Sequence, residues 1–306
     1  AEAMFRCLKE LSRSVYATKI KCNNDAMAPL YQTIHAHYVL GGKGITDEML
    51  ALWDKRKWFV LSLETALRSG LSQADRLFDH SLYRHDVIDI TRQYLSELLN
   101  YRMMKLYRAF TAGDSQTFDA QAVKIRPIMD SLEDILSTDE YYYITPLIER
   151  ARKLPHAGAD IESRVKEVYT VWDRTSPSDW LVDYTRRDFY EVVKLYYRPR
   201  LEAFLKVLEE KMTSSNRQVS LNDFIHVFRH IEYSFVDKPL KVSPIPSGKD
   251  TLKVATEIVN IHWIDDDERA ELEEARARAD KIVPVSYTHL RAHETRHDLV
   301  CRLLLE

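Results

Sequence analysis

The sequence predicts an all-α fold, an array of antiparallel helical hairpins that form a helical bundle domain. Apolar residues recur at spacings of three and four along most of the chain, which indicates amphipathic helices. Glycine is scarce, with 7 residues in 306. β-Sandwiches and barrels need many turn glycines, and a dinucleotide-binding fold needs a glycine-rich turn. With 30% charged residues, the composition favours helices joined by short loops.

The clearest helical pattern covers residues 87–110. Gly113-Asp114-Ser115 should end this helix and cap the next one. The next helix carries its apolar residues between positions 118 and 135, with Pro127 inside it. We expect Pro127 to bend that helix, because proline has no N–H to donate.

The periodicity then predicts a third helix over about 139–153, which stops at Pro155, and a fourth over 161–172. The longest pattern covers 180–212 and contains Pro199, where we expect a kink rather than an end. Ser220 should cap a helix whose apolar residues lie between 224 and 235. Further helices are expected before residue 47 and after the proline-rich connector; they cover about 4–20, 27–40 and the residues from Thr251 onward.

Four segments are expected along the chain, and the boundary at residue 55 rests on the resemblance described below. Residues 1–55 form a helical segment of uncertain origin, and residues 56–265 form the main helical domain. Residues 266–283 alternate in charge, which is typical of a solvated helix or a linker. Residues 284–306 end the chain and are treated below.

The overall charge gives no electrostatic case for nucleic acid, since the net charge is −3. No run of 18 apolar residues exists, so no membrane span is expected. The cysteines Cys7, Cys22 and Cys301 have no metal-like spacing, and no cofactor is expected. The compartment cannot be read from them.

Two stretches carry a family signature. The first contains Tyr83-Arg84-His85-Asp86 and Asp89-Ile90-Thr91-Arg92-Gln93, followed downstream by Asp134-Ile135-Leu136. The second contains Trp172, Asp183-Tyr184 and Tyr196-Tyr197-Arg198-Pro199-Arg200. Together, over about residues 60–265, they resemble the all-helical C-terminal domain of the alpha-N-acetylglucosaminidase family of glycoside hydrolases.

The resemblance implies an enzyme family that removes terminal alpha-linked N-acetylglucosamine from glycans with retention of configuration. It implies two catalytic glutamates on a (β/α)8 barrel, against which the helical domain packs to form one wall of the sugar pocket. The intact parent protein would be secreted, periplasmic or lysosome-like. This chain shows no strand–helix alternation of the kind a barrel needs, so no catalytic residue can be assigned, and the chain alone is expected to be inactive.

The resemblance makes Tyr83, Asp86 and Arg92 candidates for the wall of the sugar pocket. Asp86 and Asp89 lie on one helix face and therefore cannot flank a glycosidic bond from opposite sides. In the pocket interpretation, Tyr83 and Asp86 lie near the substrate and Arg92 holds the acids. In the alternative, the acids complement the helix dipole and Arg92 pairs with Asp89.

Four further pocket candidates are Trp172, Tyr184, Tyr197 and Arg200. Trp172 can stack on a sugar face or fill the core, and the same alternatives apply to Tyr184. The residues around Pro199 can line a cleft where a kink opens the backbone. Alternatively, the tyrosines pack in the core and Arg200 pairs with an acid.

The last segment contains His293-Glu294-Thr295-Arg296-His297, an H-E-x-x-H match that would place two zinc ligands on one helix face. No third ligand follows before the end of the chain, so we interpret the match as chance and expect no metal site. The stretch VSYTHLRAHETRHDLVCRLLLE resembles the translation of a sequencing-library adapter, as found in reading frames assembled from environmental DNA. Residues 284–306 are therefore expected to be an artefactual tail.

Two function hypotheses remain open from the sequence. The first is the helical part of an alpha-N-acetylglucosaminidase, whose partners are a catalytic barrel domain and the terminal N-acetylglucosamine of a glycan. The second is a non-catalytic helical scaffold or protein-interaction module with no sugar chemistry.

Overall fold

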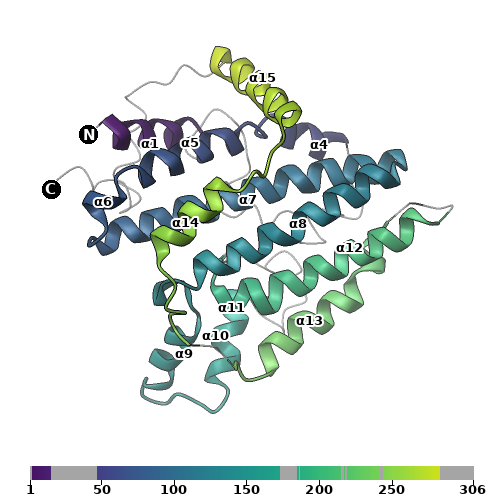
Figure 1. The fold of residues 1–306 in the computed structure, drawn as a ribbon. Helices are drawn as coiled ribbons and strands as arrows, with labels where there is room; N and C mark the ends of the chain where they lie inside the picture. Colours follow the sequence, from purple (N-terminus) through teal and green to yellow (C-terminus); the bar gives the residue numbers. More distant parts are fainter. Residues whose placement is uncertain are drawn as a thin grey trace. The chain divides into compact units, whose positions relative to one another are not determined.

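The all-α prediction is confirmed by a computed structural model of the chain, which describes residues 2–14, 47–172, 185, 187–214, 217, 219–241 and 244–282. Within these ranges every regular element is a helix (Figure 1). The chain divides into two compact units. Unit 1 comprises Ala1–Met27, Ala51–Leu98 and Asp250–Glu306, and unit 2 comprises Ala28–Leu50 and Leu99–Lys249.

Unit 1 is built around α5, in which 9 of 13 residues are buried. Helices α1, α14 and α15 pack against α5. The helices of this unit are α1 (Glu2–Arg13), α5 (Phe59–Leu71), α6 (Ala74–Leu77), α14 (Thr251–Asn260) and α15 (Asp266–Ile282). Helices α4 (Asp47–Asp54) and α7 (Ser81–Ala112) each have residues in both units.

The charged segment from Asp266 onward is a helix, which was one of its two expected forms, the other being a linker. One face of this helix, however, is not solvated. Leu272 and Ala275 on α15 are buried. The charges beside them are paired with residues of unit 1 far away in the sequence. These ion pairs are Lys57–Glu271 at 2.5 Å, Arg276–Glu10 at 2.7 Å and Arg269–Glu64 at 3.1 Å.

Unit 2 is a set of packed helices in which α12 contacts both α8 and α13, and α10 contacts both α9 and α13. Its core is lined with aromatic rings; Phe204, for example, stacks on Phe224 at 5.0 Å. In addition to part of α7, its helices are α8 (Ser115–Leu136), α9 (Thr145–Arg152), α10 (Ile161–Tyr169), α11 (Tyr190–Val192), α12 (Arg198–Met212) and α13 (Ile225–Asp237).

The turn between α7 and α8 forms as the sequence predicts. Gly113 adopts φ 74°, a left-handed conformation that glycine allows at no steric cost. The N–H groups of Gly113 and Asp114 then donate to the carbonyls of Phe110 and Ala109, which closes the end of α7. The carboxylate of Asp114 accepts the N–H of Thr117 at 3.0 Å and so caps α8.

The prediction of one continuous helix over 139–153 was wrong. A 3-10 turn forms at Glu140–Tyr142, the chain is extended at Tyr143, and α9 starts at Thr145. Pro146 lies in the first turn of α9, and proline favours helix starts because its missing N–H is not needed there. Glu191 supplies the cap instead of a local residue, since its two carboxylate oxygens accept the N–H groups of Ile144 and Thr145 at 2.9 and 3.0 Å.

Pro199 interrupts the long helical pattern as expected, and the interruption takes the form of a π-helical turn at Val193–Tyr197. Proline cannot donate a hydrogen bond to the carbonyl four residues earlier, and wider i to i+5 turns occur at such points. The helix resumes as α12. Residues 187–189 at the start of the predicted pattern are not helical.

The described residues of the proline-rich connector, 238–241 and 244–250, contain no regular structure, as predicted. Side chains of other elements hold it. Lys166 donates to the carbonyl of Lys238 at 2.7 Å, and Glu162 accepts the N–H of Leu240 at 2.7 Å. Farther along, the N–H of Ser247 donates to the carbonyl of Ser137 at 2.9 Å.

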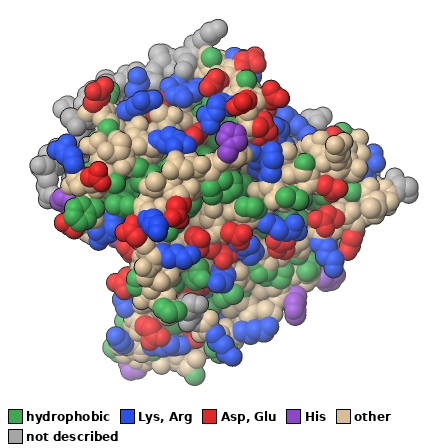
Figure 2. Space-filling view, viewed as in Figure 1, with side chains coloured by type: hydrophobic (Ala, Val, Ile, Leu, Met, Phe, Trp, Pro, Cys, Tyr) green, Lys and Arg blue, Asp and Glu red, His purple; other side chains and the backbone are tan. Residues whose placement is uncertain are grey.

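Acidic and basic side chains are intermixed on the molecular face shown in Figure 2, and neither sign forms a continuous patch there. Exposed ion pairs of the described residues include Arg126–Glu202 and Arg164–Asp160. None of the helices in the described part of the chain is long and apolar enough to cross a membrane.

Candidate functional site

The first candidate region is the start of α7, where the sequence placed Tyr83, Asp86 and Arg92. Tyr83 is buried, and its hydroxyl donates to the carbonyl of Gly70 on α5 at 2.9 Å. Arg92 pairs with Asp89 at 3.0 Å, which is the pairing that the alternative interpretation expected. The side chain of Asp86 is partly exposed.

Three groups at this site favour their neutral forms. Burial raises the pKa of Asp86 to about 7, and the nearby Asp89 adds to this rise. Burial likewise raises the pKa of Tyr83 and of the Cys7 thiol to about 12 each. A cysteine whose thiol stays protonated is a poor nucleophile, so the chemistry available here is hydrogen bonding by a neutral carboxyl group.

The second candidate region is the π-helical turn and the start of α12, with Tyr196, Tyr197 and Arg200. All three side chains lie in the core of unit 2, with 0 or 1% of their surface exposed. Arg200 pairs with Glu232 of α13 at 3.5 Å, and its guanidinium lies over the rings of Tyr196 and Phe228 at 4.7 and 5.2 Å. This is the arrangement described by the packing alternative.

The third candidate, Trp172, ends the turn that follows α10 and has an unusual backbone. Its φ is 67°, a left-handed conformation that is rare for a bulky side chain. Its N–H donates to the carbonyl of Glu167 at 2.7 Å, and its side chain is half-buried. Strained residues of this kind persist only where the surroundings enforce them, and they gather at ligand sites.

Sequence reasoning missed the residues that surround the end of α10. The hydroxyl of Thr185 donates to the carbonyl of Tyr169 at 3.0 Å, and the ring of Tyr169 meets the ring of Phe189 edge-on at 5.3 Å. These residue types form no motif. The one signal in the sequence is that Thr185 directly follows the candidate Tyr184.

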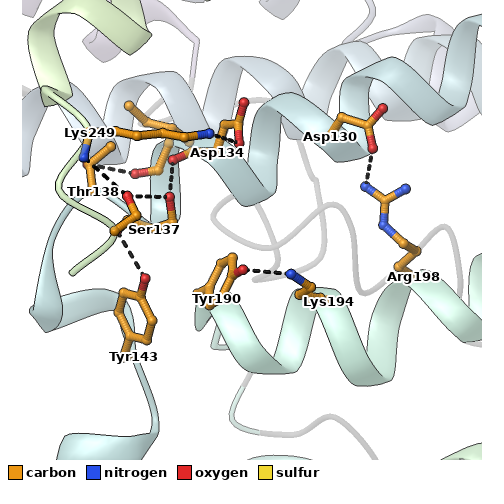
Figure 3. Close-up of polar contacts among 11 residues, drawn as sticks. Asp130, Asp134, Ser137, Thr138, Tyr143, Tyr190, Lys194, Arg198 and Lys249 are labelled. Atoms are coloured by element: carbon orange, nitrogen blue, oxygen red, sulfur yellow. Dashed lines mark hydrogen bonds and ion pairs between the residues drawn. The ribbon is translucent and has the colours of Figure 1, made fainter. Parts of the chain in front are cut away.

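A polar network on unit 2 also went unnoticed in the sequence (Figure 3). Lys249 pairs with Asp134 at 2.6 Å, and Arg198 pairs with Asp130 at 2.7 Å. Lys194 donates to the hydroxyl of Tyr190 at 2.8 Å, and this hydrogen bond raises the pKa of Lys194. The network joins α8 to the connector and to α12, which is a structural role.

Several predicted features lie outside the described residues: the helix expected over 27–40, the pocket candidate Tyr184, and the tail with His293, Glu294 and His297. Among the residues that the structure describes, no group of three or more histidine, cysteine, aspartate or glutamate side chains could hold a metal ion.

Comparison with known families gives a match over residues 3–260 to the family described as the alpha-N-acetylglucosaminidase (NAGLU) C-terminal domain. The matched range reaches farther toward the N-terminus than the motifs that carried the resemblance. The chain is also 25% identical over 201 residues to the alpha-N-acetylglucosaminidase of Homo sapiens, covering 63% of this chain and 26% of that protein.

Two solved structures from Clostridium perfringens share the fold. One is a family 89 glycoside hydrolase in complex with its substrate GlcNAc-alpha-1,4-galactose, with 20% identity and a TM-score of 0.55. The other is a family 89 glycoside hydrolase in complex with PUGNAc, with 20% identity and a TM-score of 0.56. The matches cover 64% and 66% of this chain, and 23% of each relative. The chain therefore spans about a quarter of the length of these relatives.

Proposed function

Because this chain belongs to the family of alpha-N-acetylglucosaminidase C-terminal domains, we propose that it forms one wall of a pocket for a terminal N-acetylglucosamine residue. The catalytic carboxylates would come from a barrel domain of the parent protein, and the chain alone would bind sugar without cleaving it. A glycan substrate is supported by the relative from Clostridium perfringens, which was solved with GlcNAc-alpha-1,4-galactose.

The observation that carries this proposal is the backbone of Trp172. An indole ring offers a flat apolar face and one polar N–H, which suits the alternating C–H and hydroxyl groups of a pyranose ring. A left-handed tryptophan costs about 1–3 kcal/mol. A site that served only to fill the core would favour a residue without that cost.

We propose a separate sugar contact on unit 1, the carboxyl group of Asp86. Its carboxyl group is partly exposed and, with a pKa of about 7, is mostly protonated in mildly acidic solution. A protonated carboxyl group can donate to a sugar hydroxyl as well as accept from one. We assign structural roles to Tyr83, Tyr197 and Arg200, because their buried side chains already pack or pair within the fold.

The test is sugar binding by the chain with Trp172 replaced. Wild type should bind GlcNAc-alpha-1,4-galactose weakly, as followed by ligand-observed NMR, and should release no product from an aryl N-acetyl-alpha-glucosaminide. Trp172→Gly and Trp172→Ala should both abolish binding. Trp172→Gly should be the more stable of the two by about 1 kcal/mol, because glycine accepts a positive φ.

Three outcomes would contradict the proposal. They are turnover by the repurified chain, undiminished sugar binding by both variants, and no sugar binding by wild type. The last outcome would favour the scaffold interpretation. Trp263→Ala provides a matched control, since Trp263 is also half-buried but belongs to unit 1 and has an unremarkable backbone.

A further inference from the structure

The end of α10 is defined by hydrogen bonds that close off its last carbonyl groups. The last four carbonyls of any helix lack partners within the helix. Here the carbonyl of Lys166 accepts the hydroxyl of Thr170 at 2.7 Å. The carbonyl of Glu167 accepts the N–H groups of Thr170 and Trp172 at 3.1 and 2.7 Å.

The carbonyl of Tyr169 is satisfied from farther along the chain. The hydroxyl of Thr185 donates to it at 3.0 Å across 16 residues of sequence. Phe189 adds a second contact at the same place, because its ring meets the edge of the Tyr169 ring at 5.3 Å. Tyr169 is therefore held by both its backbone and its side chain.

These contacts restrain the backbone only three residues before Trp172. Thr170 is fully buried and Val171 nearly so, so the intervening residues have little freedom to relax. A left-handed tryptophan is unfavourable by itself, and it persists only where neighbouring contacts leave no alternative. The hydrogen bonds at the α10 terminus are contacts that can enforce it.

From this geometry we infer that Thr185 is a positioning residue for Trp172, holding the α10 terminus so that the indole is presented to the sugar. This inference deepens the proposed function and rests on it. Thr185 does not touch the sugar in this scheme. Its hydroxyl acts through the carbonyl of Tyr169, and Phe189 supports it through the Tyr169 ring.

The experiment uses the full chain labelled with 5-fluorotryptophan. The chain has 5 tryptophans, and the fluorine resonance of Trp172 is identified by its loss in Trp172→Phe. The probe is the methyl alpha-glycoside of N-acetylglucosamine. In wild type, the sugar should shift the Trp172 resonance and leave those of Trp53 and Trp58, which are buried in unit 1, unmoved.

Thr185→Val keeps the size of the side chain and removes the donor. It should move or broaden the Trp172 resonance before any sugar is added, and weaken sugar binding about fivefold, as expected for the loss of one hydrogen bond. Thr185→Ser restores the hydroxyl and should restore both properties. Phe189→Leu should act in the same direction and provides a second test should Thr185→Val not fold.

The control is Thr213→Val. The hydroxyl of Thr213 also donates to a carbonyl at a helix end, that of Glu210 at 2.9 Å, but at the end of α12. It should leave the Trp172 resonance and sugar binding unchanged.

The two proposals fail in distinguishable ways. If Thr185→Val and Phe189→Leu both leave the resonance and sugar affinity of wild type unchanged, the positioning role is wrong while the pocket stands. If sugar never shifts the wild-type resonance, the pocket is wrong. The effect of Thr185→Val on the sugar-free resonance then still decides whether Thr185 holds Trp172.

Discussion

The start of α7 and the start of α12 carry similar side chains, yet the protein uses them differently. At α7, Arg92 pairs with Asp89 one turn away on the same helix, and the two side chains are 13% and 22% exposed. At α12, Arg200 pairs with Glu232 from a different helix, and the two are 0% and 4% exposed. The Asp89–Arg92 pair lies on a single helix that would form without it. The Arg200–Glu232 pair joins two helices, α12 and α13, in the core of unit 2.

The difference shows why a tyrosine–arginine pattern does not identify a pocket. A buried guanidinium needs compensation for its lost hydration. Arg200 obtains it from Glu232 and from the faces of two aromatic rings. Arg92 keeps part of its hydration and therefore needs less compensation.

Breaking each pair gives the largest expected contrast. Glu232→Ala should lower the free energy of unfolding by about 3–5 kcal/mol, because it leaves a charge buried without its partner. Asp89→Ala should lower it by about 0.5 kcal/mol, as is usual for a partly exposed pair. Urea denaturation measures both. Equal losses would show that the two regions do not differ in the way described.

The pH dependence of stability provides the next test, now at α7 alone. The folded pKa of Asp86 is about 7, above its ordinary value of 3.8. Protonated Asp86 therefore contributes to the stability of the folded state. This contribution is complete below about pH 4 and is lost as the pH rises toward 7. An asparagine at position 86 cannot ionise, so Asp86→Asn should not lose stability over this pH range. At pH 8 its Tm should exceed that of wild type by about 3 °C, after discounting for partial exposure.

At pH 4 the same variant and wild type should melt within about 1 °C of each other. Asp89→Asn serves as the matched control, because Asp89 is already paired with Arg92. A wild-type melting temperature that is flat between pH 4 and pH 8 would contradict the raised pKa of Asp86.

The last test concerns Tyr83. Tyr83→Phe removes one buried hydrogen bond to the carbonyl of Gly70 and should cost about 1 kcal/mol. Tyr141→Phe is the control on an exposed ring and should change the free energy of unfolding by less than about 0.5 kcal/mol. If Tyr83→Phe were as stable as wild type, the hydrogen bond from Tyr83 to the carbonyl of Gly70 would not contribute to stability.

Periodicity predicted the helical class and most helices, because the residues on the core-facing side of a helix recur at fixed spacings in the sequence. It also predicted the turn at Gly113, since turn chemistry is local. It failed over 139–153, where Glu191 caps α9 from 46 residues away. A pattern read along the chain contains no information about a partner at that distance.

The candidate site was predictable only in part, for a related reason. The family signature includes Trp172, but it gives neither the left-handed backbone of Trp172 nor the contacts that Thr185 and Phe189 make with the nearby Tyr169. Charged residues at three-residue spacing revealed the Asp89–Arg92 pair. The raised pKa of Asp86 depends on burial, which sequence spacing does not give.

The connector after α13 affects how readily a protease can cleave the chain. Its prolines and lack of helix indicate an exposed linker, the usual place for cleavage. Yet the N–H groups of Leu240 and Ser247 are held by Glu162 and by the carbonyl of Ser137, and the carbonyl of Lys238 is held by Lys166. A protease must bind its substrate as an extended strand, so these hydrogen bonds must break before cleavage. The segment that the sequence indicates as easiest to cleave is therefore hydrogen-bonded to other elements of unit 2 near both of its ends.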